Sequence, residues 1–463
     1  MSYRFINFET KIFTMEIKRD IVERLLEWKK SEDRRPLLIQ GARQIGKTWV
    51  MKHFGKSHYV YLAYFNFDAS PELDAEFRQS RDPKRLISRL SLYCDSPIVP
   101  GKTLIVFDEI QESSDALNSL KYFCEEAPEY HIMAAGSLLG VAIHSHSGFP
   151  VGKVDFIKMY PVSFKEYLRA RYPETVEFID NMEAIEPLPE ILRGKLEETY
   201  RAYMICGGMP KAAVASLDNR GIEKIVKEQR EILTSYYLDF SKHAPTAEFP
   251  KIAAIWESIP SQLAKENRKF IYKVVKNGAR AREYENALTW LREAGLLYQI
   301  FCCSKPGLPL SAFNDISAFK IYLLDIGLLR ELAGIPPEIF NSANRSFVEF
   351  KGALTENYAL QSLVPYFDQF PRYWVSSGKA EVDFLIQNRL NVIPVEVKSA
   401  DNISSKSLSV YIGKYTPSVS VILSTKPLDI IENPASTKLL YLPIYLTDWL
   451  PKFLELTEAG PEA

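Results

Sequence analysis

The stretch Gly41-Ala42-Arg43-Gln44-Ile45-Gly46-Lys47-Thr48, GARQIGKT, decides the fold of the N-terminal part of this chain. It follows the apolar run 37–39 and fits the pattern G-x-x-x-x-G-K-[ST] at every constrained position. That pattern is typical of a strand that turns tightly into a helix and faces phosphate groups with its backbone N–H groups. We predict that all eight residues bind a nucleotide, with Lys47 on the β- and γ-phosphates and the Thr48 hydroxyl on Mg²⁺. The alternative, a chance strand-turn-helix connection, is disfavoured by a second motif downstream.

Two carboxylates end that second motif. Residues 103–108 read TLIVFD, and Glu109 follows. Such an apolar run is typical of a buried parallel strand, and ligands of open α/β sheets lie beyond the carboxyl ends of these strands. We expect Asp108 to orient the Mg²⁺ shell and Glu109 to polarise the attacking water. The two motifs therefore predict ATP as the nucleotide, Mg²⁺ as the cofactor and hydrolysis as the reaction.

A polar residue, Ser137, closes a third apolar run, HIMAAG at residues 131–136. A hydroxyl at this place can sense the γ-phosphate or the attacking water, which makes Ser137 a catalytic candidate beside Lys47 and Glu109. It can equally cap the N-terminus of a helix that begins at Leu138. The two roles are compatible, and the sequence leaves both open.

Strand and helix patterns alternate through the first part of the chain. We expect an amphipathic helix over 17–30, a strand over 59–67, a helix over 115–126 and a strand over 154–159. Alternation of this kind predicts an α/β fold with a parallel sheet.

Composition favours an enzyme of several domains. The 463 residues, 46% hydrophobic and 25% charged, supply enough apolar material for roughly three domains. No stretch approaches the roughly 18 apolar residues of a membrane span, and the N-terminus, where Met15 is an alternative start to Met1, lacks a secretory pattern. Five cysteines without C-x-x-C spacing predict a reduced, cytoplasmic protein that does not bind membranes. His144 and His146 have no acidic or thiol neighbours and are expected to be loop residues rather than metal ligands.

Four segments together resemble a known family: GARQIGKT, LIVFDEIQ, AAGSLLG and FPVGKVDFIKMYPVSFKEYL. They are similar to the AAA+-type ATPases of bacteria and archaea that carry a C-terminal domain of unknown function. The resemblance implies an additional-strand core, with the strand before Ser137 lying between the phosphate-loop strand and the Asp108 strand. The family's FPVG-[RK] segment is residues 149–153 here. Lys153 stands where Arg is common, which puts an arginine-finger role for this position in doubt.

We expect the ATPase core to cover residues 1–162 and a mainly helical, lid-like region to cover 163–250. In the resembling family, the segment Gly207-Gly208-Met209-Pro210 marks the lid next to the nucleotide. The alternative is an ordinary connector between helices. No basic residue of this region is assigned as a second sensor.

Residues 251–340 are predicted to form a winged helix-turn-helix. Helical patterns at 251–265, 270–276 and 280–294 precede a strand at 296–303, and the third helix would be the recognition helix. Eight basic and three acidic residues lie between positions 265 and 292. Lys276, Arg280 and Arg282 are the candidates for contact with DNA phosphates. The alternatives are a solvated charged face or a protein-packing module.

The C-terminal region, 341–463, carries a second acidic pattern. Asp383 lies in one predicted strand, Glu396 and Lys398 lie on one face of the next, and Glu356 lies in a preceding helix. This arrangement resembles the PD-(D/E)xK nuclease fold. The resemblance implies that Asp383 and Glu396 bind a second Mg²⁺ or Mn²⁺, that Lys398 activates water, and that Glu356 adds a ligand or an outer contact. The alternative is the outer face of a half-exposed hairpin.

Two classes of function follow from these motifs. The first is an ATP-driven switch that acts on DNA, with or without nuclease activity. The second is a signalling or scaffold ATPase whose winged-helix and C-terminal domains bind protein partners. AAA+ proteins often complete their site from a neighbouring subunit, so a homo-oligomer is compatible with both. A net charge of −1 means that a nucleic-acid site has to be local.

Overall fold

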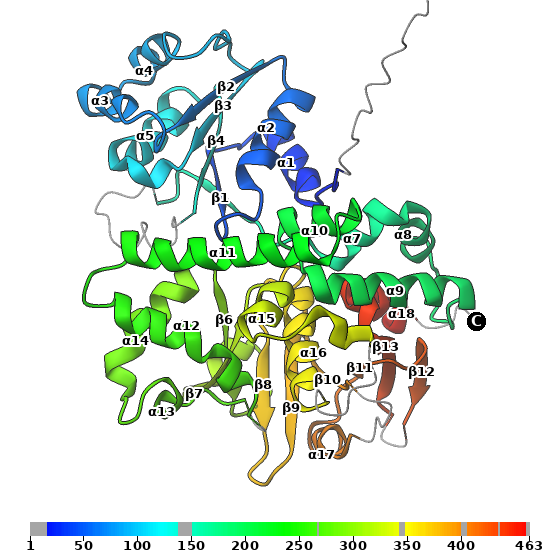
Figure 1. The fold of residues 1–463 in the computed structure, drawn as a ribbon. Helices are drawn as coiled ribbons and strands as arrows, with labels where there is room; N and C mark the ends of the chain where they lie inside the picture. Colours follow the sequence, from blue (N-terminus) through cyan, green and yellow to red (C-terminus); the bar gives the residue numbers. More distant parts are fainter. Residues whose placement is uncertain are drawn as a thin grey trace, which may run out of the picture.

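A computed structural model describes residues 16–137, 151–265, 268–341, 348–399, 405–433 and 436–459. Two β-sheets lie on either side of a long helix, α11 (Ile222–His243), which runs across the molecule between them (Figure 1). The sheet formed by the N-terminal part has five strands, and the sheet formed by the C-terminal half has eight. The phosphate-loop motif belongs to the first sheet.

The first sheet is entirely parallel, with strand order β2-β3-β4-β1-β5. Its members are β1 (Leu37–Gln40), β2 (Tyr61–Asn66), β3 (Thr103–Asp108), β4 (His131–Gly136) and β5 (Asp155–Lys158). Every residue of β3 and β4 is buried, as expected for central strands covered on both faces. Strand β4, which ends at Gly136 just before Ser137, lies between β1 and β3, so this prediction is confirmed.

Helices cover both faces of the first sheet. They are α1 (Ile21–Lys30), α2 (Lys47–His58), α3 (Glu72–Gln79), α4 (Pro83–Leu90) and α5 (Ser114–Glu126), with a short 3-10 turn, η1 (Ile110–Glu112). Leu25 and Phe54 pack with Val106 on one face, whereas Leu86 and Leu120 pack with the other. His144, His146, Met1, Met15 and the start of the 149–153 segment lie outside the described residues.

The middle region is helical, as predicted. It contains α7 (Phe164–Arg171), α8 (Pro173–Asp180), α9 (Glu190–Cys206), α10 (Pro210–Leu217) and α11. Gly207 ends α9 with φ 68°, and a Cβ there would lie 2.3 Å from Asp325 Oδ1. A Cβ on Gly208 would lie 2.2 Å from the Val162 carbonyl oxygen. The glycine pair is therefore a close-packed junction between three parts of the chain, which fits the connector alternative, and its lid role stays a prediction.

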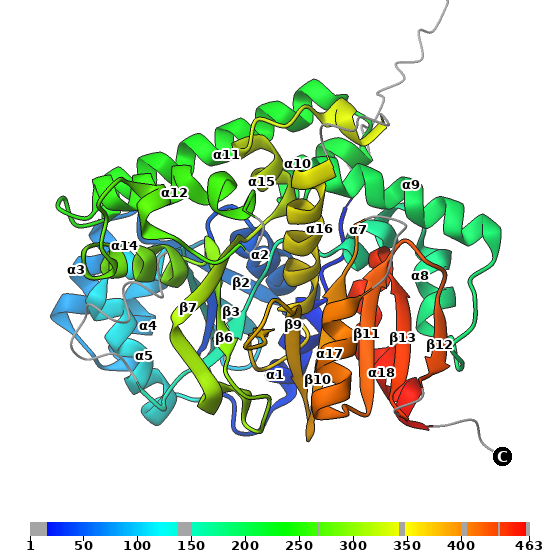
Figure 2. The same ribbon diagram turned by 90° about the horizontal axis from the view of Figure 1, so that it is seen from below.

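The second sheet is mixed, with strand order β12-β13-β11-β10-β9-β8-β6-β7. Its members are β6 (Leu297–Cys303), β7 (Asn314–Leu323), β8 (Arg372–Val375), β9 (Glu381–Asn388), β10 (Asn391–Val397), β11 (Val419–Ser424), β12 (Asp429–Glu432) and β13 (Lys438–Pro443). Figure 2 shows this sheet from below. Helices α12 (Phe249–Leu263), α13 (Tyr272–Val275) and α14 (Ala281–Glu293) precede the β6-β7 hairpin in the order expected for a winged helix. However, β6 also pairs with β8, so one sheet continues across the boundary predicted at 340.

The remaining helices cover the second sheet. They are α15 (Ile326–Leu332), α16 (Val348–Leu363), α17 (Lys406–Tyr415) and α18 (Leu450–Ala459), with 3-10 turns at Leu310–Phe313, Pro337–Asn341 and Ile444–Trp449. Tyr358 of α16 packs in the same core as Phe384, whereas Tyr411 of α17 packs against Trp374. The two helices therefore contribute to different apolar cores of the sheet.

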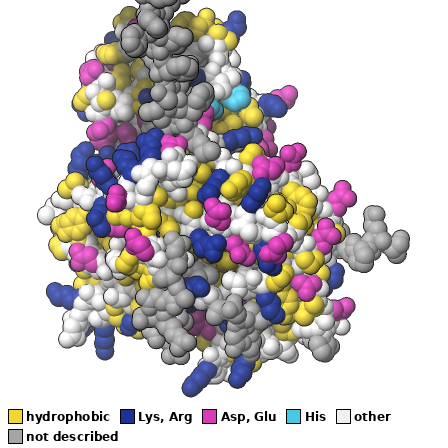
Figure 3. All heavy atoms as spheres, turned by 45° about the vertical axis from the view of Figure 1, so that its right-hand side comes forward, with side chains coloured by type: hydrophobic (Ala, Val, Ile, Leu, Met, Phe, Trp, Pro, Cys, Tyr) yellow, Lys and Arg dark blue, Asp and Glu magenta, His cyan; other side chains and the backbone are white. Residues whose placement is uncertain are grey.

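Basic and acidic side chains are interspersed over the face drawn in Figure 3, as the near-zero net charge leads one to expect. The five cysteines all lie in the described part and are free. Within the described residues, no helix is both long enough and apolar enough to cross a membrane.

Candidate nucleotide site and C-terminal acidic cluster

The phosphate loop turns through three residues with positive φ: Gly41 (153°), Gln44 (66°) and Gly46 (95°). A Cβ on Gly41 would lie 2.4 Å from the Met159 carbonyl oxygen, so only glycine fits at this position. Gly46 is the residue before the first turn of α2, in the left-handed conformation. Steric demands thus explain both glycines of the motif, and α2 begins at Lys47 as the sequence predicts.

The Lys47 side chain folds back over the loop. Its Nζ donates to the carbonyl oxygens of Gly41 (2.8 Å) and Ala42 (2.7 Å). Burial lowers the pKa of Lys47 to about 8, against the opposing effect of the Glu109 and Asp108 carboxylates. Among the described residues, the hydrogen bonds of this buried ammonium go to neutral carbonyl groups, so it gains from an anionic partner such as a polyphosphate.

Thr48 and Asp108, the predicted Mg²⁺ ligands, meet directly. Thr48 Oγ1 donates to Asp108 Oδ2 over 2.7 Å, and the Tyr64 hydroxyl donates to the same oxygen over 2.8 Å. Asp108 is buried at the end of β3. A hydroxyl and a carboxylate are hard oxygen donors, and Mg²⁺ in phosphate sites takes its other ligands from phosphate and water. The residues present therefore fit this cofactor, although no group of three or more His, Cys, Asp or Glu side chains in the described part would hold a metal alone.

Glu109 follows β3 in a left-handed conformation, φ 51°. Gln111 Nε2 donates to Glu109 Oε2 over 2.8 Å, and Ser137 Oγ donates to Glu109 Oε1 over 3.2 Å. The structure thus brings the catalytic candidates Glu109 and Ser137 together from neighbouring strands. Gln111 was not predicted, although it stands two positions after Glu109 in the motif. The helix-capping alternative for Ser137 involves residues outside the described part.

Helix α11 contacts the variable residues of the loop. The Arg43 guanidinium forms an ion pair with Asp239, and Gln44 Nε2 donates to Ser235 Oγ over 2.7 Å. The Tyr236 hydroxyl donates to the Arg43 carbonyl oxygen over 2.8 Å. Burial raises the pKa of Asp239, and Arg43 opposes this shift. Arg43 and Gln44, two of the predicted nucleotide-binding residues, therefore form direct contacts with the helical region.

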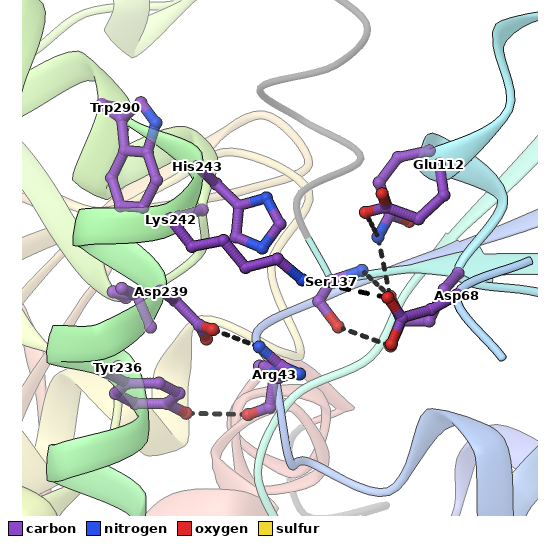
Figure 4. A pocket seen from close by; sticks show the side chains of 13 residues that line it. Arg43, Asp68, Glu112, Ser137, Tyr236, Asp239, Lys242, His243 and Trp290 are labelled. Atoms are coloured by element: carbon purple, nitrogen blue, oxygen red, sulfur yellow. Dashed lines mark hydrogen bonds and ion pairs between the residues drawn. The ribbon is translucent and has the colours of Figure 1, made fainter. Parts of the chain in front are cut away.

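A cavity of about 30 Å³ lies where β3, β4, the phosphate loop and α11 meet. Its lining includes Glu109 and Ser137 on one side and Asp239, Lys242 and His243 of α11 on the other. Figure 4 shows Lys242 extending from α11 toward Ser137 and Asp68, while Asp239 faces Arg43. The α11 residues were missed because nothing local in their sequence indicates a partner almost two hundred positions away.

Arg19 supports the loop on another side. It donates to the carbonyl oxygens of Ile45 (3.0 Å) and Tyr160 (2.7 Å), and its Nε contacts Glu166 Oε2 at 3.1 Å. Arg19 and Glu166 are both buried. This buried ion pair links the segment before α1 to the loop and to α7, and no sequence motif indicated it.

The predicted DNA contacts Lys276, Arg280 and Arg282 are exposed. Tyr284 and Leu291 face the protein interior from the same helix, α14, so Arg282 lies on its outward side. These three side chains are accessible to a DNA phosphate backbone, as the prediction requires, and DNA contact itself stays a prediction.

In the C-terminal cluster, Lys398 Nζ contacts Glu396 Oε1 at 2.7 Å, and Asp383 Oδ2 accepts the Val397 N–H over 2.8 Å. Burial and the Asp383 carboxylate raise the pKa of Glu396 to about 7, while Lys398 acts in the opposite direction. Glu396 Oε2 is buried and has no hydrogen-bond partner in the described part of the chain. The three residues predicted from the sequence thus lie together.

Glu356 lies in a separate ionic network. Its carboxylate is buried, contacts Lys320 Nζ at 3.2 Å, accepts the Tyr322 hydroxyl proton and pairs with Arg268. Lys320 is fully buried and also contacts Glu381 at 2.6 Å. The sequence did not indicate these cations. They neutralise Glu356, so a role for it as a metal ligand would require it to leave them.

Comparisons with known proteins agree with the N-terminal geometry. Residues 33–168 match the family model described as AAA domain. Residues 197–339 match a domain of unknown function (DUF8612), and residues 351–444 match another (DUF4143). No curated protein matches the chain.

Several solved structures align with this chain at low similarity. The Walker-type ATPase paby2304 of Pyrococcus abyssi aligns with 14% identity and a TM-score of 0.43, over 68% of this chain and 96% of that one. The Orc1 protein of Aeropyrum pernix, solved in complex with DNA, aligns with 12% identity and a TM-score of 0.29, over 71% and 95%. The RuvB Holliday junction branch migration motor of Thermotoga maritima aligns with 13% identity and a TM-score of 0.28, over 63% and 90%. Residues 33–168 therefore match an AAA domain and have the phosphate-loop geometry described above, and they are followed by segments that match two domains of unknown function.

Proposed function

We propose that this protein is a Mg²⁺-dependent ATPase that acts as a nucleotide-driven switch. The observation that carries the proposal is the hydrogen bond between Thr48 Oγ1 and Asp108 Oδ2, beside the paired side chains of Glu109 and Ser137. These groups lie at the carboxyl ends of adjacent parallel strands, where α/β sheets bind ligands. Two predicted Mg²⁺ ligands and a predicted base therefore share one edge of the sheet.

The roles follow from the chemistry of each group. Lys47 binds the β- and γ-phosphates, and Thr48 and Asp108 hold the metal, which when bound neutralises phosphate charge. Glu109 accepts a proton from water while the water oxygen forms a bond to the γ-phosphorus. The bond from that phosphorus to the β-γ bridging oxygen breaks, and ADP leaves with the electron pair. The products are ADP and inorganic phosphate.

The switch character rests on the contacts of α11. This helix bonds to Arg43 and Gln44 of the phosphate loop and belongs to the region 197–339. A phosphate group that draws Arg43 toward itself competes with Asp239 for the same guanidinium. ATP binding is thereby coupled to the position of α11, and through it to the second sheet.

ATP turnover tests the proposal most simply. Phosphate release is measured with and without double-stranded and single-stranded DNA over a range of protein concentrations. We expect Mg²⁺-dependent turnover in the wild type and none in Lys47→Ala, with Lys56→Ala, an exposed lysine of the same helix, as the matched control. Absence of both ATP binding and turnover in the folded wild type would remove the proposal. Turnover per molecule that rises with concentration indicates a homo-oligomer.

Action on DNA is the first output that we propose. Arg280→Glu with Arg282→Glu reverses two exposed charges and leaves the buried face of α14 intact. We expect DNA stimulation of turnover to disappear while basal turnover stays within about twofold. Turnover that no nucleic acid changes favours the alternative, a signalling or scaffold ATPase whose C-terminal regions bind protein.

Nuclease activity of the C-terminal region is a second candidate function. It is favoured by the buried Oε2 of Glu396, for which the described residues provide no hydrogen-bond partner. Asp383 lies near this carboxylate, whose other oxygen contacts Lys398. An unpaired carboxylate oxygen beside a second carboxylate is stabilised by a divalent cation such as Mg²⁺ or Mn²⁺. Lys398 would then position or activate the hydrolytic water.

Metal-dependent cleavage of DNA checks this candidate. We expect cleavage to vanish in Asp383→Ala and in Lys398→Ala, and to survive in Lys47→Ala unless cutting requires ATP. The exposed Asp429 of β12 supplies the matched control, Asp429→Ala. Cleavage that persists in both cluster variants comes from another site or a contaminant and rules the assignment out.

A further inference from the structure

We propose that Lys242 of α11 is a catalytic residue that supplies, from within the same chain, the positive charge for γ-phosphoryl transfer. This inference rests on the proposed ATPase function and assigns one of its missing parts. The sequence left the source of that charge open, because no arginine finger was identifiable. In the structure, a positively charged side chain near this site comes from the helical region rather than from the AAA domain.

The first observation is the position of Lys242. It lines the cavity that Glu109 and Ser137 line from the opposite side. In Figure 4 its side chain extends along the cavity toward Ser137. Glu109 and Ser137 are the groups expected beside the γ-phosphate and the attacking water, so an ammonium in this cavity faces the group being transferred.

The second observation is how α11 is fixed. Ser235 and Asp239 bond to Gln44 and Arg43, and Tyr236 bonds to the Arg43 carbonyl oxygen. Position 242 is seven residues after 235 and three after 239, so it lies on the same face of the helix. The loop contacts therefore determine where Lys242 projects. Because the same loop would bind the phosphates, it also fixes the position of Lys242 relative to them.

The third observation concerns which cations are available. Lys47 lies over the loop carbonyls and is assigned to the β- and γ-phosphates, and Arg43 has to give up its ion pair with Asp239 before it can contact a phosphate. Among the described residues, Lys242 forms a long ion pair with Asp68, 3.8 Å between Nζ and Oδ1, and 62% of its side chain is exposed. An exposed pair of this kind holds its lysine weakly. Lys242 can therefore leave Asp68 for a phosphate oxygen at little cost.

The cation is needed mainly in the transition state of phosphoryl transfer. Negative charge on the three equatorial oxygens and on the leaving oxygen is stabilised by a cation delivered to the γ-phosphate, which in related chemistry accelerates turnover by 10³ or more. Lys acts as a point charge without the bidentate geometry of Arg. We expect a smaller contribution, about 100-fold in kcat.

The experiment compares Lys242→Ala, Lys242→Arg and Lys227→Ala in the full-length protein. Lys227 is also exposed on α11, pairs with Glu231, and lies 15 residues away, roughly 22 Å along the helix. We expect Lys242→Ala to lower kcat about 100-fold with the dissociation constant for ATP changed less than about threefold. Lys242→Arg should retain at least a tenth of the activity, and Lys227→Ala all of it. Unchanged kcat in Lys242→Ala overturns the inference and leaves the ATPase proposal standing.

A binding measurement separates a catalytic role from a structural one. Affinity for ADP with Mg²⁺ and aluminium fluoride, which imitates the transferring phosphoryl group, is compared with affinity for ATP. Lys242→Ala should weaken the first about 100-fold and the second hardly at all. Equal weakening of both, or recovery of turnover on mixing Lys242→Ala with Lys47→Ala subunits, contradicts a charge supplied in cis. A wild type that binds no ATP overturns the ATPase proposal and this inference with it.

Discussion

The phosphate-loop site and the C-terminal cluster both place carboxylates at the ends of buried strands, but they satisfy those carboxylates differently. Asp108 accepts hydrogen bonds from the neutral groups of Thr48 and Tyr64. One carboxylate oxygen of Glu396 contacts Lys398, the other has no hydrogen-bond partner among the described residues, and Asp383 lies nearby. The first site is organised by neutral donors before its cofactor arrives. The second stores electrostatic repulsion, which a cation or a proton relieves.

The largest effect is expected at the organised site. Asp108→Asn preserves shape but removes the charge that holds Mg²⁺, and we expect kcat to fall at least 100-fold, about 3 kcal/mol or more. Turnover measured against Mg²⁺ concentration should also require more metal for half-maximal rate. Asp115→Asn, on the first turn of α5, is the control and should behave as wild type. An Asp108→Asn protein with normal turnover and normal Mg²⁺ dependence would break the assignment of this site.

A substitution that blocks the glycine conformation of the phosphate loop should have the next largest effect. Gly41→Ala places a Cβ 2.4 Å from the Met159 carbonyl oxygen at a positive φ, so the loop has to shift. We expect a loss of roughly 2 kcal/mol in the free energy of unfolding and at least tenfold weaker ATP binding.

Urea unfolding and nucleotide titration measure these two quantities for Gly41→Ala. Gly194→Ala, inside α9 at a position where a Cβ has open space, is the control. It should stabilise the protein by about 0.5–1 kcal/mol. Equal stability and ATP affinity in Gly41→Ala and the wild type would mean that the loop adopts another conformation.

In the C-terminal cluster of Asp383, Glu396 and Lys398, removing a charge is expected to stabilise the protein at high pH. The pKa of Glu396 is raised from 4.5 to about 7 in the folded protein, so folding favours its protonated form. Its favourable contribution is complete below pH 4.5 and is lost as the pH rises to about 7. Glu396→Gln has no carboxylate to ionise, so its stability should fall less than that of the wild type between pH 5 and pH 8. We expect the difference between the two losses in unfolding free energy to be roughly 1–3 kcal/mol.

Unfolding free energies at both pH values check this difference for Glu396→Gln. The wild type is the necessary reference, because burial also raises the pKa of Asp325 to about 6 and that of Asp448 to about 7. Glu432→Gln, on exposed β12, should leave the pH dependence unchanged. If Glu396→Gln leaves it unchanged too, the cluster is not strained. Added Mn²⁺ that stabilises the wild type more than Glu396→Gln at pH 8 would sharpen the case for a metal site.

The smallest expected effect tests the link between the two regions. Tyr236→Phe removes one hydrogen bond to the Arg43 carbonyl oxygen, which is worth about 1 kcal/mol. We expect a loss of that size in stability and a change of a few-fold in the ATP dissociation constant. Tyr237→Phe, the exposed neighbour on α11, is the control. Identical ATP affinities in both variants would argue that α11 does not sense the nucleotide.

Much of the first sheet could be predicted from the sequence because its signals are local. Residues 41–48 and 103–109 each contain their own turn geometry and chemistry, so the meeting of Thr48 with Asp108 followed from the strand order. The Asp239–Arg43 pair could not be predicted in this way. The amphipathic pattern of α11 indicates that a face is buried, but it does not identify the partner.

The C-terminal half shows the same limit. Asp383, Glu396 and Lys398 were predicted to lie together because strand alternation and a short hairpin relate them. The pairing of β6 with β8 and the buried contacts of Glu356 with Lys320 depend on tertiary structure alone. The lysine lies in a strand whose apolar neighbours predict only a buried strand.

One measurement bears most directly on the central claim that Glu109 is the base of a Mg²⁺-dependent ATPase. Phosphate release and ATP binding are measured on the same samples of wild type and Glu109→Gln, with Glu112→Gln as the neighbouring control. The account predicts steady phosphate release by wild type and Glu112→Gln, and at least 100-fold less by Glu109→Gln with ATP still bound. Release by Glu109→Gln at the wild-type rate would contradict it.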